Sequence, residues 1–339
     1  MRRLWSSILL FGVSTALAAA EEKLLDKIVV KVPAEEALVL ERHENAGVKI
    51  DGFLEESIWQ RLSAYDEFVV LEPDTLMKPE HPTRVRVFYD ADGLYFGIDM
   101  DQPVDRLITR LSGRDRRDIK REQIGVTLDT SGEGRYGYWF GVHLGDSVMD
   151  GTVLPERKFS DEWDGAWRAA TQQTPHGWSA EFYIPWGTVA MPVVQGKRKL
   201  GIYMSRLVAY NDERYGWPTL PFTRPQFMSR MQALEVEGID PRQQYSYYPF
   251  TAVTDDRFDD ETRYRSGLDV LWRPSSSFQL SATVNPDFGA VESDDVVINL
   301  SATETFFPEK RLFFVEGQEI FVTSPRADTR SESVGRGGL

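Results

Sequence analysis

Alternating apolar and polar positions recur along this chain and predict short β-strands rather than helices. Glycine and aspartate separate many of the alternating runs, as expected where an antiparallel chain turns. One short helix is predicted where Leu54, Ile58 and Trp59 share a face. The predicted strands cover residues 83–89, 93–100, 123–129, 136–144, 166–172, 178–184 and 200–208. This series predicts a mainly β fold that begins with a jelly-roll-like β-sandwich.

The composition changes near Asp240, and two further alternating runs follow at residues 264–272 and 278–284. In the second run an apolar side chain stands at every second position. Such alternation is typical of a strand in an outer-membrane barrel, whose apolar side faces lipid. It is equally typical of a half-buried strand in a water-exposed antiparallel sheet. Both interpretations predict an antiparallel strand region after the sandwich.

Composition and charge narrow the classes of function. The 339 residues include 39 Lys and Arg against 53 Asp and Glu, and the net charge of -14 argues against a nucleic-acid partner, which requires a basic face. Cysteine is absent, so disulfide bonds, thiol catalysis and cysteine-ligated metals are excluded. None of the four histidines lies in a zinc-protease motif. The aromatic content of 12% is high enough to supply flat rings on which sugars stack.

Residues 1–20 predict a signal peptide. Two arginines precede an apolar run at residues 4–13, and small alanines stand before a cleavage site after Ala20. The apolar run is shorter than an ordinary membrane-spanning helix, and an N-terminal anchor helix is the alternative interpretation. Residues 21–45 are charged and mixed in character, as in a leader or linker. We therefore expect an exported protein.

Several segments resemble the family-nine type of carbohydrate-binding module. They are Ile50–Trp59 (IDGFLEESIW), Val85–Asp90 with Gly93–Phe96, Glu122–Asp129 (EQIGVTLD) and Trp178–Trp186 (WSAEFYIPW). The resemblance implies a β-sandwich over residues 46–238 that binds an oligosaccharide or polysaccharide without catalysis. In the best-known modules of that family two tryptophans clamp the sugar. Here Ile119 and Phe222 stand near the two positions, so the clamp is not kept residue by residue.

A second resemblance begins after the sandwich. The segments Val284–Phe288 (VNPDF) and Thr305–Gly317 (TFFPEKRLFFVEG) are similar to a family of uncharacterised bacterial outer-membrane proteins, in which a sandwich precedes a long β-barrel. The resemblance implies that residues 240–325 begin such a barrel, in the periplasm or outer membrane of a Gram-negative bacterium. A closed barrel needs about eight strands or more. We therefore expect a fragment or truncated gene product with an incomplete barrel and a disordered tail at residues 326–339.

Aromatic residues beside acidic turns are the predicted sugar-binding side chains. Trp163 and Trp167 lie in one segment with Asp161 and Asp164, which would offer indole faces for stacking and carboxylates for sugar hydroxyls. The other two candidates are Trp217 and Phe222, in predicted loops. Each tryptophan has the alternative role of filling the core of a sandwich.

The sequence gives weaker signals for metal-binding and catalytic residues than for sugar-binding ones. Oxygen-rich loops bind calcium without cysteine or histidine, and Asp99 and Asp101 are the candidate ligands. The resemblance to family-nine modules also implies a structural calcium ion. A glycosidase needs two carboxylates at a defined separation, but with so many acidic residues such clusters arise on any solvated turn. We do not expect this chain to be an enzyme.

Together these observations predict non-catalytic glycan binding by an exported envelope protein, within polysaccharide breakdown. Two alternatives stay open. The sandwich would be a periplasmic cap or plug of an outer-membrane barrel that serves transport or assembly without binding sugar, which the missing tryptophan clamp favours. Otherwise it would be an accessory domain of an O-glycosyl hydrolase, which a carboxylate pair beside Trp163 and Trp167 would favour.

Overall fold

A computed structural model describes residues 37–161, 163–192, 194, 196–239, 244–256, 261–275 and 278–285. The predicted signal peptide, most of the leader, residues 286–325 and the predicted disordered tail lie outside this part of the chain. The chain divides into two compact units. Unit 1 consists of residues 1–161 and 165–241, and unit 2 consists of residues 162–164 and 242–339.

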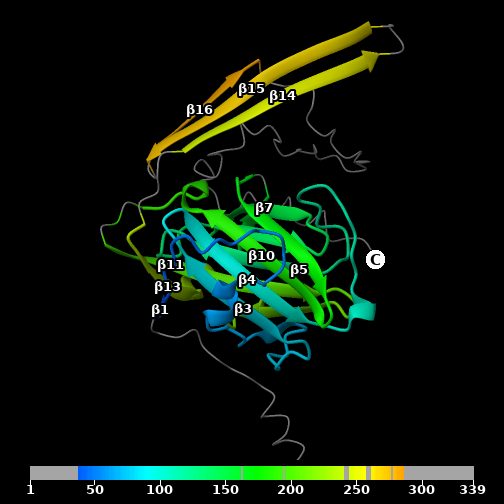
Figure 1. Ribbon diagram of the computed structural model, residues 1–339, viewed down its shortest axis with the longest axis vertical. Helices are drawn as coiled ribbons and strands as arrows, with labels where there is room; N and C mark the ends of the chain where they lie inside the picture. The colour runs from blue at the N-terminus through cyan, green and yellow to red at the C-terminus, as the bar shows by residue number, and fades with distance from the viewer. Residues whose placement is uncertain are drawn as a thin grey trace, which may run out of the picture. The chain divides into compact units, whose positions relative to one another are not determined.

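Unit 1 is a β-sandwich made of a large and a small sheet (Figure 1). The main path of the large sheet is β1 (Leu38–Val39), β13 (Gln232–Glu237), β11 (Lys197–Val208), β5 (Gln123–Asp129), β6 (Gly137–His143), β7 (Val148–Leu154) and β8 (Lys158–Ser160). A branch of this sheet begins at β11, which also pairs with β12 (Glu213–Trp217), and β12 in turn pairs with β2 (Val69–Glu72). The small sheet has the order β3 (Thr83–Tyr89), β4 (Gly93–Asp101), β10 (Gly177–Pro185) and β9 (Arg168–Thr174).

Helices are short in the described part of the chain. The α-helix α2 (Ser57–Arg61) buries Ile58 and Trp59, as the shared face predicts. The three 3-10 helices are η1 (Val104–Arg106), η2 (Trp186–Thr188) and η3 (Met228–Arg230). Among the residues that the structure describes, no helix has the length and apolar character needed to cross a membrane.

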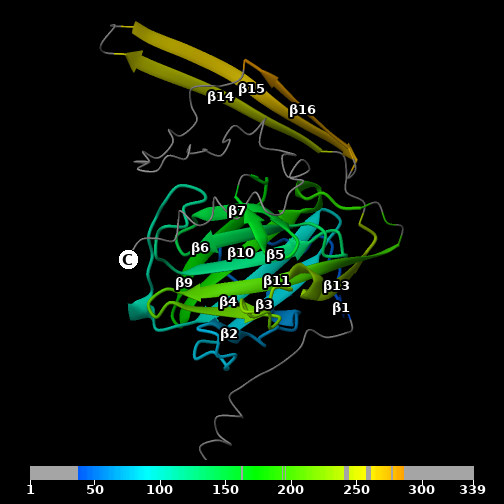
Figure 2. The same cartoon turned by 180° about the vertical axis from the view of Figure 1, so that it is seen from behind.

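The sandwich core forms between the two sheets because side chains alternate along each strand. On β5, Ile124, Val126 and Leu128 are buried. On β11, Arg206 follows the same alternation as Met204, and its guanidinium donates to backbone oxygens of Pro82 and Asp101 in and beside the small sheet. This side of β11 therefore faces the small sheet, seen behind the large sheet in Figure 2.

A second apolar cluster lies on the opposite face of the large sheet. Tyr203 stands one position before Met204 on β11, so its ring points away from the small sheet. It packs with buried residues of β2, of β7 and of the segment before β13, namely Val69, Leu71, Val153, Leu220, Phe227, Met228 and Met231. Burial of these side chains anchors residues 218–231 on this face. That segment carries Phe222.

Unit 2 contains a three-stranded antiparallel sheet in the order β14 (Gln244–Asp256), β15 (Glu261–Ser275) and β16 (Phe278–Val284). The predicted run at 264–272 lies within β15, and the run at 278–284 coincides with β16. The predicted fold class is confirmed, because a mainly β sandwich is followed by a separate antiparallel strand region.

Candidate functional site

Six side chains of unit 1 form a continuous row of contacting aromatic rings and guanidinium groups, which we call the aromatic–arginine row. Its members are Arg117, Trp139, Phe159, Phe227, Arg157 and Phe222. The guanidinium of Arg117 lies 4.5 Å from the Trp139 ring. Phe159 contacts Trp139 at 6.5 Å and Phe227 at 5.6 Å between ring centroids. The guanidinium of Arg157 lies 4.5 Å from the Phe227 ring and 4.9 Å from the Phe222 ring.

The indole of Trp139 reaches strand β8 because the residue between them on β7 is a glycine. The Trp139 Nε1–H donates to the backbone oxygen of Ser160 at 3.0 Å. Gly151 of β7 lies beneath this contact, and a Cβ added there would stand 1.9 Å from the same Ser160 oxygen. Only glycine therefore allows β8 to approach closely enough to place Phe159 beside Trp139.

The turn between β7 and β8 holds the segment that displays Phe222. Arg157 Nη2 donates to the backbone oxygens of Leu220 and Pro221, both at 3.0 Å, and its Nε donates to the Arg224 oxygen at 3.3 Å. Three carbonyl groups thus converge on one guanidinium. Because the guanidinium group of Arg157 is planar and carries several N–H donors, it can bind these carbonyl groups at its edge while one face stacks on an aromatic ring.

Glu156 completes this anchor from the neighbouring position. Its carboxylate accepts hydrogen bonds from the backbone N–H groups of Phe227 and Ser229. Burial opposes ionisation, but these bonds outweigh it and hold the pKa of Glu156 below its ordinary value. In this turn the Glu156 carboxylate therefore binds N–H groups of the segment at 218–231, and the Arg157 guanidinium binds carbonyl groups of the same segment.

Two rings of the row reach solvent. The exposed fraction is 37% for Phe159 and 44% for Phe222. Beside them, Arg157 Nη1 has no hydrogen-bond partner among the described residues and is not buried. Arg117 makes one ion pair, from its Nε to Asp161 Oδ2 at 3.7 Å. The row thus presents aromatic faces next to polar hydrogen-bond donors.

The structure brings two of the six predicted sugar-binding residues to the row. Phe222 is a member, and Asp161 borders it through Arg117. Trp163 is half-buried and Asp164 is exposed, and their roles in sugar binding stay predictions. Trp217 is buried against Tyr65, with the ring centroids 5.7 Å apart. Its ring is therefore used in packing.

Trp167 is built into the edge of the sandwich core. Its ring stacks on Phe182 at 5.5 Å and meets the edge of Phe140 at 5.2 Å. Its Nε1–H donates to Asp150 Oδ2 at 3.0 Å. One face and the polar edge of the indole are thus occupied, which favours the packing role over the predicted sugar platform.

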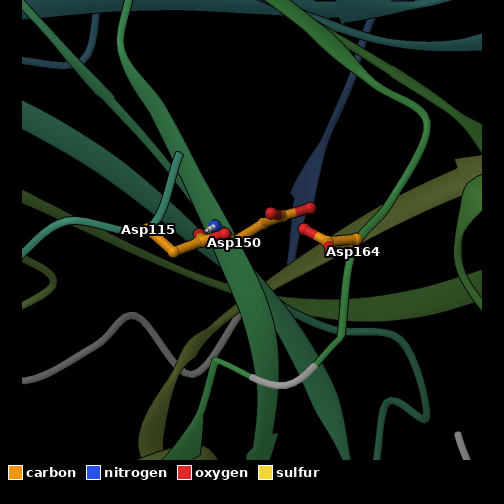
Figure 3. Close-up of side chains that lie close together, drawn as sticks. All are labelled: Asp115, Asp150 and Asp164. Carbon is orange, nitrogen blue, oxygen red and sulfur yellow. Dashed lines mark hydrogen bonds between the residues drawn. The ribbon is translucent and has the colours of Figure 1, made fainter. Parts of the chain in front are cut away.

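Asp150, Asp115 and Asp164 form a cluster in which carboxylate oxygens lie within 4.8 Å of one another (Figure 3). The Asp150 backbone N–H donates to Asp115 Oδ1 at 3.1 Å. The fully buried Asp150 carboxylate accepts from Gly165 N–H at 2.7 Å and from Trp167, and it pairs with Arg114. These bonds already compensate its charge, so the geometry gives Asp150 a structural role.

The structure also gives a structural role to the two predicted calcium ligands. In the β3–β4 hairpin Arg84 stands directly opposite Asp99. Its guanidinium contacts Asp99 at 2.8 Å and Asp101 at 2.6 Å. The hydrogen bond from Arg84 lowers the pKa of Asp101 below its ordinary value. A guanidinium therefore takes the place that the sequence predicts for a cation, because antiparallel register aligns Arg84 with both carboxylates.

Sequence reasoning missed Trp139, Phe159, Phe227 and Arg157 as parts of a site. Phe159 lies in a three-residue strand that the alternation does not reveal. Arg157 looks like an ordinary charge on a turn, whereas Arg117 belongs to the basic run at residues 110–121, which the sequence marks either as a solvated loop or as a surface for anionic lipid or an acidic glycan. The aromatic content was the available signal, but it does not show which rings lie side by side.

Comparisons with known proteins show similarity in both parts of the chain. A carbohydrate-binding module of family 9 from Caldicellulosiruptor kristjanssonii, solved with cellotriose, is 12% identical, with a TM-score of 0.44 over 60% of this chain and 94% of the module. The module from the same organism solved with glucose is 13% identical, with a TM-score of 0.42 over 60% of this chain and 96% of the module. A putative carbohydrate-binding protein from Bacteroides uniformis is 14% identical, with a TM-score of 0.45 over 59% of this chain and 98% of that protein.

The second part of the chain has its own match. Residues 241–325 match a family described as a domain of unknown function (DUF5916). Among curated proteins, no sequence matches this chain.

Proposed function

We propose that unit 1 binds a glycan without catalysis and that the aromatic–arginine row is the binding surface. The observation that carries this proposal is the pair of exposed rings, Phe159 and Phe222, of which the first contacts the Phe227 ring and the second contacts the Arg157 guanidinium. The C–H faces of a sugar ring stack on such aromatic faces, and its hydroxyl groups bond to neighbouring polar side chains. Asp161, Arg117 and Arg157 supply acceptors and donors at the border of the row.

Binding is favoured over hydrolysis by the state of the nearby carboxylates. A glycosidase needs one carboxyl group to donate a proton and another to act as nucleophile or base. Asp150 is fully buried and already accepts hydrogen bonds from Gly165 and Trp167. Asp161 is exposed and ion-paired with Arg117. Neither arrangement resembles an acid held ready beside a bound sugar.

Titration of the full chain, kept in a mild detergent, tests the proposal. The ligands are cellotriose, xylo-oligosaccharides and an oligomer of galacturonic acid, followed by heat release and tryptophan fluorescence. Phe222→Ala and Phe159→Ala are each expected to weaken binding by up to about ten-fold, because one stacked ring contributes roughly 0.5–1.5 kcal/mol. Phe53→Ala is the matched control, because Phe53 is 43% exposed and lies outside the row.

Saturable binding that both row variants weaken and the Phe53 variant leaves unchanged supports the site. If the folded chain binds none of these glycans, the proposed function is wrong. If the three variants lose affinity equally, the row is not the binding surface.

We further propose that unit 2 contacts a lipid bilayer and that the protein is exported to the outer membrane. The register of β14–β16 places aromatic and aliphatic side chains on one face of this sheet, interrupted by Thr251, Thr262 and Ser266. Described members of this face are Tyr245, Tyr247, Pro249, Val253, Tyr264, Leu268, Val270, Trp272, Leu280, Ala282 and Val284. The opposite face carries Arg263, Arg265, Asp269, Ser281 and Thr283, together with the aromatic residues Tyr248 and Phe250.

Aromatic residues mark both ends of the apolar face. Tyr245 stacks on Tyr247 and Trp272 at one end, and Tyr264 lies opposite Val253 at the other. From Tyr245 to Val253 the strand covers the ~9–11 residues that a tilted strand needs to cross a bilayer. Aromatic girdles at both interfaces are typical of outer-membrane strands. The face that carries Arg263, Arg265 and Asp269 would then line the interior of a barrel.

Flotation of the full chain with phospholipid vesicles tests the membrane proposal. Tyr247→Lys is expected to reduce the floated fraction, because Tyr247 is 61% exposed on the apolar face. Tyr248→Lys is the matched control, since the adjacent residue points to the other face. Equal flotation of both variants would contradict the assignment of the lipid-facing side.

A further inference from the structure

We propose that the glycan bound at the aromatic–arginine row contains uronic acids and that the guanidinium groups of Arg117 and Arg157 hold its carboxylates. The inference rests on the proposed function, because it concerns the ligand class of the same site. It goes beyond that function by separating acidic glycans from neutral ones such as cellotriose.

The two guanidinium groups flank the exposed ring of Phe159. This ring contacts Trp139 on one side and Phe227 on the other. Arg117 stacks on Trp139, and Arg157 stacks on Phe227. A sugar ring on Phe159 would therefore have a cation toward each end, which suits a chain that carries carboxylates on successive sugars.

Both arginines keep donors available for a ligand. Arg117 makes no hydrogen bond within the described residues, and its only ion pair spans 3.7 Å between partly exposed side chains. Such a pair contributes little to stability, so a ligand carboxylate can replace Asp161. Arg157 uses Nε and Nη2 for backbone carbonyls and keeps Nη1 free. The planar guanidinium matches a carboxylate with two parallel hydrogen bonds.

The remaining cations of the basic segment at residues 110–121 are largely engaged elsewhere. Four examples are Arg114 with Asp150, Arg116 with Asp118, Lys120 with Asp212, and the buried Arg121, which donates to backbone carbonyls. Arg117 differs from them because it lies over a ring of the row. Asp161 and Glu156 lie beside these two guanidinium groups, so the preference for an anionic ligand rests on directed guanidinium contacts at the exposed rings and not on a net local charge.

The test compares two ligands of equal length, a hexamer of galacturonic acid and cellohexaose, with the full chain in mild detergent. At low salt the acidic hexamer is expected to bind at least ten-fold tighter, and its affinity is expected to fall as salt is raised. Arg117→Gln is expected to reduce the affinity for the acidic hexamer by about ten-fold and the affinity for cellohexaose by a smaller factor, because a neutral hydroxyl group loses one hydrogen bond whereas a carboxylate loses a charge-assisted contact. Arg117 is preferred over Arg157 for this variant, because Arg157 also anchors the Phe222 segment.

Arg224→Gln is the matched control. Arg224 is exposed on the Phe222 segment, and only its backbone oxygen is used in binding Arg157. If Arg117→Gln and Arg224→Gln have equal effects, loss of any positive charge near the row weakens binding and the assigned contact is wrong. If cellohexaose binds as tightly as the acidic hexamer, the inference is overturned while glycan binding stands. If neither hexamer binds the folded chain, both the inference and the proposed function fail.

Discussion

At the scale of single residues, the buried carboxylate of Asp150 binds groups from two separate loops. Its carboxylate accepts from the Gly165 backbone and the Trp167 indole, and it pairs with Arg114. The side chain is fully buried, so its ionised form depends on these partners. The segment with Trp167 and the basic segment with Arg114 are therefore held by the same group.

Asp150→Ala is expected to lower the free energy of unfolding by about 2–4 kcal/mol, because two N–H donors and one guanidinium lose their acceptor. The measurement is urea-induced unfolding followed by tryptophan fluorescence. Asp118→Ala is the control, since its ion pair with Arg116 is exposed and its loss should leave the midpoint unchanged. Equal midpoints for the two variants would show that Asp150 is not an anchor.

At the scale of elements, Glu181 attaches the segment before α2 to strand β10. Its Oε2 accepts from the backbone N–H groups of Asp51 and Gly52, and its Oε1 accepts from Trp59 Nε1, each at 2.9 Å. Gly52 has a φ of +87°, and a Cβ there would lie 2.6 Å from the Thr171 backbone. Glycine is thus required for the close approach that makes these bonds.

The same carboxylate predicts a dependence of stability on pH. Burial raises the pKa of Glu181 from 4.5 to about 7. The folded chain therefore holds this proton more tightly than the unfolded chain, and the stability that it contributes is lost as pH rises from about 4.5 through about 7. Glu181→Gln removes the titration and is expected to flatten this part of the stability profile.

Thermal unfolding at pH 5 and pH 8 measures the effect as the difference between wild type and variant. Glu133→Gln serves as the control, because Glu133 lies on an exposed turn and pairs with Arg135. A pH profile of Glu181→Gln that runs parallel to the wild type would mean that burial of Glu181 does not control this transition.

At the scale of the whole molecule, the two units differ in how much of their apolar surface is buried and in how many of their strand edges are paired. Unit 1 buries apolar residues both between its sheets and under the segment at 218–231. In unit 2, within the described residues, β14 and β16 each pair only with β15. The sheet therefore leaves backbone edges and an aromatic face that require further strands, lipid or another chain.

Residues 21–240 are accordingly expected to stay in solution without detergent, whereas the 339-residue chain is expected to aggregate. Centrifugation of both proteins at equal concentration, with and without detergent, measures the soluble fraction. Detergent should restore the longer chain, because it covers the apolar face of β14–β16. Equal solubility in plain buffer would contradict this account of unit 2.

The sequence by itself determined the fold class and many of the strands. A two-residue alternation is a local property, so the bounds of β3, β5 and β16 can be predicted without knowing any partner strand. Strand β8 escapes this reasoning because three residues are too short to show a period. Strand β14 escapes it because Tyr247, Tyr248, Pro249 and Phe250 interrupt the alternation.

The tertiary structure alone decided which aromatic rings are buried and which meet in a row. An indole ring packs well in a hydrophobic core and also stacks well on a sugar. The sequence therefore does not show that Trp167 and Trp217 are used in packing while other rings are exposed. Arg117 and Phe222 lie in one row only because Trp139, Phe159, Phe227 and Arg157, which come from separate segments, link them. Likewise, Arg84 contacts both Asp99 and Asp101 because strand register sets it opposite Asp99. Contacts between distant segments depend on register and packing, which local sequence patterns do not specify.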